Sequence, residues 1–142
     1  MIRQLFPDDW QTFRDLRLEA LELEPDAFLS THADWVTQTE AEWRARLDSS
    51  AVFIAEDPDP QGLVGLLPDG CVVMVYVRAA ARGKGLAQAL MQRVRDEARA
   101  RGMPRLWLHV ASGNRPAQSL YERLGYRVEG QADDDFVMAR TP

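Results

Sequence analysis

Residues 75–87 (VYVRAAARGKGLA) decide the fold and indicate the first functional feature of this chain. They continue an almost unbroken apolar run, residues 71–77, which predicts a strand covered on both faces. The loop RGKG, residues 82–85, breaks the strand, and a helical pattern runs from residue 86 to about 101. A glycine loop that opens a helix presents backbone N–H groups beside the positive end of the helix dipole. It is therefore a candidate site for phosphate or pyrophosphate.

Two common phosphate loops do not fit this stretch. The P-loop pattern requires Ser or Thr after Gly-Lys, where this chain has Gly85, and requires Gly where it has Arg78. The dinucleotide pattern G-x-G-x-x-G matches Gly83 and Gly85 and then meets Gln88. The pattern that remains is R-x-x-G-x-A, over residues 82–87. An alternative interpretation is a solvated basic turn before a helix.

A second block has the same strand, loop and helix order. Residues 106–110 (LWLHV) predict a strand, and residues 116–124 (PAQSLYERL) predict a helix. Pro116 suits the first helical turn and Gly125 suits the end of the helix. The two blocks are joined by the predicted helix that follows the glycine loop.

Both blocks resemble the GCN5-related N-acetyltransferase (GNAT) family. Residues 82–87 resemble its pyrophosphate loop, [Q/R]-x-x-G-x-[G/A], and residues 108–126 resemble V-x-x-x-N-x-x-A-x-x-L-Y-x-x-L-G-[F/Y]. The second pattern is matched in register by Val110, Asn114, Ala117, Leu120, Tyr121, Leu124, Gly125 and Tyr126. The resemblance is firm over residues 71–130 and implies an acetyl-CoA-dependent N-acetyltransferase, with acetyl-CoA as co-substrate and no metal.

The resemblance also implies a set of cofactor-binding residues. Backbone groups of Val75 and Val77 would bind the pantetheine arm, and a backbone N–H of this strand would polarise the thioester carbonyl. Asn114 would hydrogen-bond the cofactor arm, although an asparagine before a helix is also an ordinary cap. The diphosphate would be held by Arg82, Gly83, Lys84, Gly85, Leu86 and Ala87.

The catalytic candidates are Tyr121 and His109. Tyr121 occupies the family position of the general acid near the cofactor sulfur, but its helical spacing with apolar neighbours also fits plain core. Strand alternation places His109 with Trp107, opposite the other residues of its strand. Histidine can take a proton from an incoming ammonium, although a structural histidine is an equal alternative.

Further residues are secondary candidates. Tyr76 and Glu129 are weaker candidates for the base, and His32 and Trp35 for the acceptor pocket. The acidic residues Asp133, Asp134 and Asp135 form a predicted turn that either draws a cationic amine or serves solubility only. Cys71 is expected to be a small apolar residue, so no nucleophile is placed to carry an acyl group, and we expect direct attack in a ternary complex.

The predicted elements follow the order β-α-α-β-β-β-α-β-α-β-β, which indicates an α/β fold with a mixed sheet (α+β). We expect one domain over residues 1–142. In the N-terminal half we expect a strand at 2–6, a helix from Trp10 capped by Asp8 or Asp9, and a loop or short turns at 26–38. A capping box at Thr39 opens a second helix. A hairpin at 51–56 and 62–67 follows, and two short strands, 126–129 and 136–139, close the sheet.

Composition narrows the partners. The net charge is −5 and the chain has one cysteine and two histidines. The negative charge disfavours nucleic acid as a partner, and the few cysteines and histidines disfavour a metal site and a disulfide framework. A single cysteine also agrees with a cytoplasmic location. No apolar run reaches the ~20 residues of a membrane span. We expect a small-molecule or peptide amine as acceptor, with a homodimer left open. The alternative function is a non-catalytic acetyl-CoA-binding sensor or scaffold.

Overall fold

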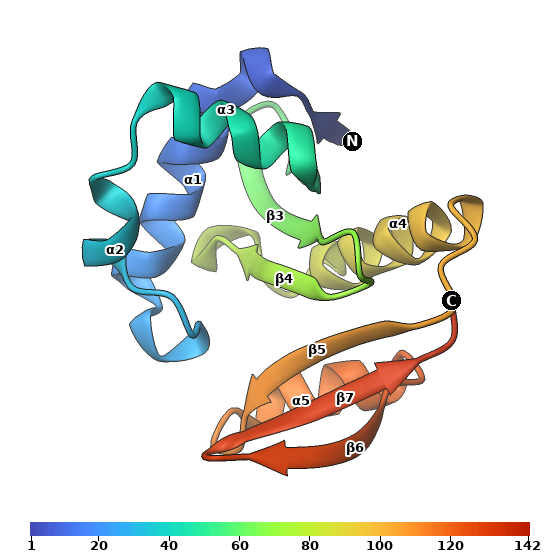
Figure 1. Cartoon of the computed structure of the whole chain (residues 1–142). Helices are drawn as coiled ribbons and strands as arrows, with labels where there is room; N and C mark the ends of the chain where they lie inside the picture. The colour runs from blue at the N-terminus through green and yellow to red at the C-terminus, as the bar shows by residue number, and fades with distance from the viewer.

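The computed structural model describes residues 1–142, which form seven strands and five α-helices (Figure 1). The strands are β1 (Ile2–Leu5), β2 (Ala51–Glu56), β3 (Pro60–Leu66), β4 (Val72–Val77), β5 (Leu106–Ala111), β6 (Arg127–Ala132) and β7 (Asp135–Arg140). The helices are α1 (Trp10–Leu23), α2 (His32–Val36), α3 (Glu40–Ser49), α4 (Leu86–Ala100) and α5 (Arg115–Arg123). This is the predicted order with one addition, because α2 forms in the stretch expected to be a loop or short turns.

The sheet is divided between β4 and β5. An antiparallel sheet in the order β1-β2-β3-β4 lies edge to edge with a second antiparallel sheet in the order β5-β7-β6. The two meet in a parallel bridge between Cys71 and Trp107, where the Trp107 N–H donates to the Gly70 carbonyl at 3.0 Å. A Cβ on Gly70 would lie 2.1 Å from the Arg105 carbonyl oxygen, so this close approach requires glycine. Beyond the bridge the two strands diverge (Figure 1).

Helices cover both faces of the first sheet, as predicted. α4 packs on β2, β3 and β4, in a core that continues into the second sheet and α5. α1 and α3 cover the other face, where the ring of Phe13 stands edge-on to Trp43 with centroids 5.3 Å apart. Burying a side chain such as Phe13 or Phe53 contributes about 1.5–3 kcal/mol. These two cores hold β4 in place from either side.

Some local expectations are confirmed and others are wrong. The capping box is present, since Thr39 Oγ1 accepts from the Glu42 N–H and the Glu42 carboxylate accepts from the Thr39 N–H, both at 3.2 Å. Asp9 does not cap α1, because its carboxylate accepts from the Phe6 N–H at 2.8 Å instead. The predicted cover on both faces of β4 is confirmed, since Val72 belongs to the core under α4, and Met74 and Tyr76 belong to the core under α1 and α3. Its residues alternate between buried and half-buried, and its free edge borders the opening between the sheets.

Candidate active site

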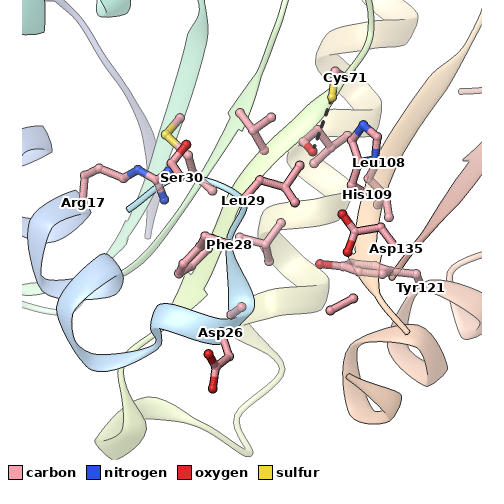
Figure 2. Close-up of a pocket in the computed structure, with 16 residues that line it drawn as sticks. Arg17, Asp26, Phe28, Leu29, Ser30, Cys71, Leu108, His109, Tyr121 and Asp135 are labelled. Carbon is pink, nitrogen blue, oxygen red and sulfur yellow. Dashed lines mark hydrogen bonds between the residues drawn. The ribbon is translucent and has the colours of Figure 1, made fainter. Parts of the chain in front are cut away.

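A cleft of about 250 Å³ opens where β4 and β5 diverge (Figure 2). Its walls are β4, β5, the inner face of α5, the first residue of β7, and residues 26–30, which follow α1 and close one end. The polar and reactive side chains that line it are Arg17, Asp26, Ser30, Cys71, His109, Tyr121 and Asp135. Groups from six separate parts of the chain, with Arg17 supplied by α1, therefore meet in one cavity.

A bulge in β4 shapes one wall of the cleft. The pairing of β3 with β4 shifts register between Leu63 and Gly65, and Met74 has a φ of 62°, in the left-handed region. A Cβ on Gly65 would lie 2.4 Å from the Met74 methyl group, so the small residue opposite gives the methionine its room. A bulge interrupts the ladder and re-aims neighbouring residues. Val73 and Val75 are left half-buried on the cleft wall.

The glycine loop lies beyond the end of β4 and is open to a ligand. Gly83 and Gly85 have φ values of 80° and 76°, and no atom lies within 4 Å of a Cβ built on either. The backbone N–H groups of residues 83–88 donate to no group of the chain. Unpaired donors at the start of the 15-residue helix α4 fit a diphosphate.

The two cations of this loop differ in what they contact. Arg82 is held back, because its Nε donates to the Val77 carbonyl at 3.0 Å and its Nη2 pairs with Glu24 at 2.6 Å. Lys84 is exposed and has no ion-pair partner in the chain. Lys84 is therefore the cation that is free to meet a phosphate, and Arg82 fastens the loop to β4 and to the end of α1.

Asn114 is the cap of α5. Its Oδ1 accepts from the Ala117 N–H at 3.3 Å, and Gln118 Nε2 braces the preceding turn by donating to the Ala111 and Ser112 carbonyls. The backbone N–H of Asn114 donates to the Ala111 carbonyl at 2.9 Å, whereas its side-chain Nδ2 donates to no group of the chain. Asn114 therefore caps the helix, as the alternative interpretation predicted, and its side-chain Nδ2 remains free to donate to a ligand.

Tyr121 projects from α5 into the cleft. It is 7% exposed, its hydroxyl has no hydrogen-bond partner in the chain, and Figure 2 shows the oxygen directed toward β4. Burial, with a smaller effect of the neighbouring Tyr126, raises the pKa of Tyr121 above its ordinary value. The phenol is therefore protonated at neutral pH and can donate that proton.

His109 lies on the opposite side of its strand from the buried residues of β5, as the alternation predicts. It is exposed, it lines the cleft, and its ring meets Trp107 edge-on with centroids 5.4 Å apart. An exposed imidazole at the cleft mouth can exchange protons with solvent.

The weaker candidates lie elsewhere. The Tyr76 hydroxyl donates to Glu19 at 3.0 Å on the α1 side of the sheet. Glu129, which belongs to β6, pairs with Arg105. His32 and Trp35 sit on α2 and do not border the cleft.

The acidic turn is shorter than predicted. Asp133 and Asp134 form the tip between β6 and β7, where the Ser112 N–H donates to the Asp134 carbonyl at 2.7 Å. Asp135 instead begins β7, pairs with Ala111 in register, and lines the cleft. The three carboxylates therefore do not lie in one turn, because β7 begins one residue earlier than expected and Asp135 lines the cleft.

Cys71 also borders the cleft, at 5% exposure. Burial, together with the nearby Asp69 carboxylate, raises the pKa of the Cys71 thiol to about 11. A protonated thiol is a poor nucleophile.

Arg17 was missed by the sequence reasoning. It is the only charged residue among the buried residues, 3% exposed, and neither Nε nor Nη1 has a hydrogen-bond partner. Burial, and then the like charge of Arg46, lower the pKa of Arg17 to about 10, so it stays charged at pH 7. Its position on the apolar face of α1, four residues after Phe13, is a signal that the sequence does contain.

The aromatic neighbours compensate Arg17 only in part. Its guanidinium lies 4.9 Å from the Phe28 ring centroid and 4.5 Å from that of Trp35. Such contacts contribute about 0.5–2 kcal/mol each, whereas burying an unpaired ion costs several kcal/mol. The contacts within the chain therefore offset only part of the free-energy cost of burying this guanidinium.

The profile of the acetyltransferase (GNAT) family matches residues 5–126. The chain belongs to this family. Among solved structures, the N-acetyltransferase PaiA of Thermoplasma acidophilum, in complex with coenzyme A, superposes with a TM-score of 0.82 at 17% identity. That match covers 100% of this chain and 98% of the other. A putative acetyltransferase of Salmonella typhimurium, yncA, solved with acetyl-CoA, gives 0.79 at 25% identity over 99% and 92% of the two chains. The GNAT chain thus has the acyl-CoA N-acyltransferase fold.

Curated relatives match part of this GNAT chain. The L-methionine sulfoximine/L-methionine sulfone acetyltransferase of Pseudomonas aeruginosa is 42% identical over 57 residues, 40% of this chain and 33% of that protein. The streptothricin acetyltransferase of Streptomyces lavendulae is 42% identical over 56 residues, 39% and 30% of the two chains. The matched region spans about a third of the length of these relatives. None of the helices has the length and apolar character to cross a bilayer.

Proposed function

We propose that this GNAT protein transfers an acetyl group from acetyl-CoA to the primary amine of a small molecule, by direct attack in a ternary complex. The observation that carries the proposal is the course of β4. The strand ends near the open glycine loop, and its bulged middle forms the wall of the cleft that Tyr121 enters. The matched relatives from Pseudomonas and Streptomyces are named for small-molecule acceptors, which supports that acceptor class.

Each part of the chain then has a chemical role. The N–H groups of residues 83–88, with Lys84, would hold the diphosphate, and the backbone of Val75 and Val77, with the Asn114 amide, would position the pantetheine arm. A backbone N–H at the β4 bulge would stabilise the negative charge that develops on the carbonyl oxygen.

His109 and Tyr121 would move the protons. An alkyl amine has a pKa near 10 and is mostly an ammonium at pH 7, so His109, directly or through water, takes one proton from it. The freed nitrogen bonds to the thioester carbon while the carbon–sulfur bond breaks. Tyr121 gives its proton to the leaving sulfur, and the new amide nitrogen loses its second proton to restore Tyr121. The products are the acetamide, the CoA thiol and one proton.

A screen of amines with acetyl-CoA, reading released thiol, tests this function. We expect thiol release with at least one class of small amine and acetyl-CoA binding by calorimetry. Binding without release for any amine would favour the alternative, a non-catalytic acetyl-CoA sensor. A buried, unpartnered tyrosine hydroxyl in the cleft supports the enzyme over the sensor. The single cysteine of the chain and the use of acetyl-CoA support a cytoplasmic location.

A further inference from the structure

Arg17 presents its guanidinium to the end of the cleft that residues 26–30 close (Figure 2). None of its three nitrogens donates a hydrogen bond to any group of the chain, and it takes part in no ion pair. Asp26 borders the same cleft without pairing with it. A side chain that is 97% buried with its donors unused is rare in a folded protein, since buried polar groups are almost always hydrogen-bonded.

The surroundings hold this guanidinium in position. The rings of Phe28 and Trp35 lie against it at 4.9 and 4.5 Å, and Arg46 lies over Trp35 at 4.0 Å. Aromatic faces fix a guanidinium plane but accept no hydrogen bond along its edge. Arg46 does not line the cleft, but its like charge adds to the positive potential around Arg17. A planar fork that is fixed, charged and unpaired suits a carboxylate, which it can bind through two parallel hydrogen bonds.

We propose that Arg17 forms a carboxylate subsite, so that the amine acetylated by this protein also carries a carboxylate, as an amino acid does. The proposal rests on the acetyl transfer proposed above and names the class of its acceptor. Other anions are less suited, because the site offers one buried arginine between apolar rings and no second cation lines the cleft beside it.

The far side of the cleft has the opposite character. His109, Tyr121 and Asp135 lie there, on β5, α5 and β7 (Figure 2). With Arg17 at one side and Asp135 at the other, the cleft matches a molecule that has a carboxylate at one end and an ammonium at the other. The amine would then face the two residues that are proposed to move protons. Apolar groups, among them Leu29 and Val73, also line the cleft and suit an uncharged side chain of the acceptor.

The first experiment changes the acceptor and leaves the protein intact. Amino acids, their primary carboxamides and the matching amines without a carboxyl group are compared as acceptors by thiol release. The same compounds are titrated calorimetrically into the protein with CoA. We expect kcat/KM for an amino acid to exceed that for its carboxamide by roughly 30-fold or more, as for loss of one partner of a buried charge pair.

The second experiment changes the arginine. Arg17→Met, which keeps length without charge, should raise the KM for the amino acid by roughly 30-fold and leave the KM for the carboxamide within about threefold. Arg17→Lys keeps the charge and should recover part of the loss. The matched control, Arg14→Met, removes an arginine of the same helix that pairs with Asp15 outside the cleft, and should behave as the parent.

The outcomes separate the two proposals. Equal kcat/KM for amino acids, carboxamides and plain amines would overturn the carboxylate subsite while acetyl transfer stands. An equal loss with both acceptors in Arg17→Met would also overturn it, because the arginine would then only support the fold. If no amine is acetylated, the acetyl-transfer proposal fails. Calorimetry then decides the subsite, which requires an amino acid to bind the parent and not Arg17→Met.

Discussion

Arg78 clamps Glu19 through two hydrogen bonds of 2.8 Å, from Nε and Nη2 to the two carboxylate oxygens. The Tyr76 hydroxyl adds a third, at 3.0 Å. Glu19 belongs to α1, and the other two residues stand at the end of β4, so the group ties the helix of Arg17 to the strand that forms the cleft wall.

Acid should weaken this clamp. Burial alone would raise the pKa of Glu19, but the hydrogen bonds from Arg78 and Tyr76 outweigh it and hold the pKa below its ordinary value. The stabilisation is therefore complete above the unfolded carboxyl pKa of about 4.3 and is lost as the pH falls through the lower folded value. Glu19→Gln should reduce the free energy of unfolding at pH 7 by about 1–2 kcal/mol.

Urea unfolding of parent and variant between pH 7 and pH 3 measures this effect. The difference between them should shrink as the pH falls below 4. Glu22→Gln is the control, since Glu22 is exposed on the same helix and forms no ion pair. A difference between Glu19→Gln and the parent that stays constant over this range would contradict the clamp.

The glycine loop predicts the loss of acetyl-CoA binding in Gly85→Glu. The new carboxylate would stand where a diphosphate must approach the start of α4, so the affinity should fall at least ~100-fold. Gly102→Glu is a matched control at the other end of α4. Its φ of 68° imposes the same backbone strain, and its Cβ would also meet no atom within 4 Å. Calorimetric titrations that give both variants the same acetyl-CoA affinity would refute the loop as the binding site.

Tyr121→Phe should lower kcat by roughly 10²-fold or more, within the range of general acid catalysis, with little change in acetyl-CoA affinity. Tyr126→Phe serves as control. Tyr126 is 3% exposed, its ring centroid is 6.0 Å from that of Tyr121, and burial raises its pKa to about 12. It does not line the cleft. Steady-state kinetics decides the role, and a Tyr121→Phe enzyme with the parent's kcat would make this tyrosine a packing residue.

His109→Gln should lower kcat/KM at pH 7 by roughly 10²-fold, and the deficit should shrink above pH 9. The amine loses its proton unaided as the pH nears its own pKa of about 10, so the base becomes dispensable there. His32→Gln is the control, because His32 stands on α2 outside the cleft. A deficit that is equal at pH 7 and pH 10 would assign His109 a structural role.

Cys71→Ala should keep activity within about threefold of the parent. The thiol, whose pKa is raised to about 11, is protonated at neutral pH and should carry no acetyl group. Mass spectrometry of the parent after incubation with acetyl-CoA should show no added acetyl mass. An acetylated parent together with an inactive Cys71→Ala would replace direct attack by a covalent route.

The parts of the site that depend on neighbours in the chain could be predicted. The glycines of the phosphate loop take positive φ, Asn114 caps α5, and the Thr39 capping box forms. Each of these arrangements involves residues within a few positions of one another, so the local pattern is enough to determine it. The alternation that exposes His109 is equally local, because strand geometry turns successive side chains to opposite faces.

The tertiary structure decided what lies across the cleft. Asp135 entered the site because β7 begins at this residue, in register with β5, and pairing between strands is set by residues far apart in the chain. Arg17 lies on the apolar face of α1, yet the sequence does not show that the segment after the helix folds back over it with aromatic rings and no carboxylate partner. The energy of a buried charge depends on what surrounds it, and only the packing of α1 against residues 26–30 and β4 determines those surroundings.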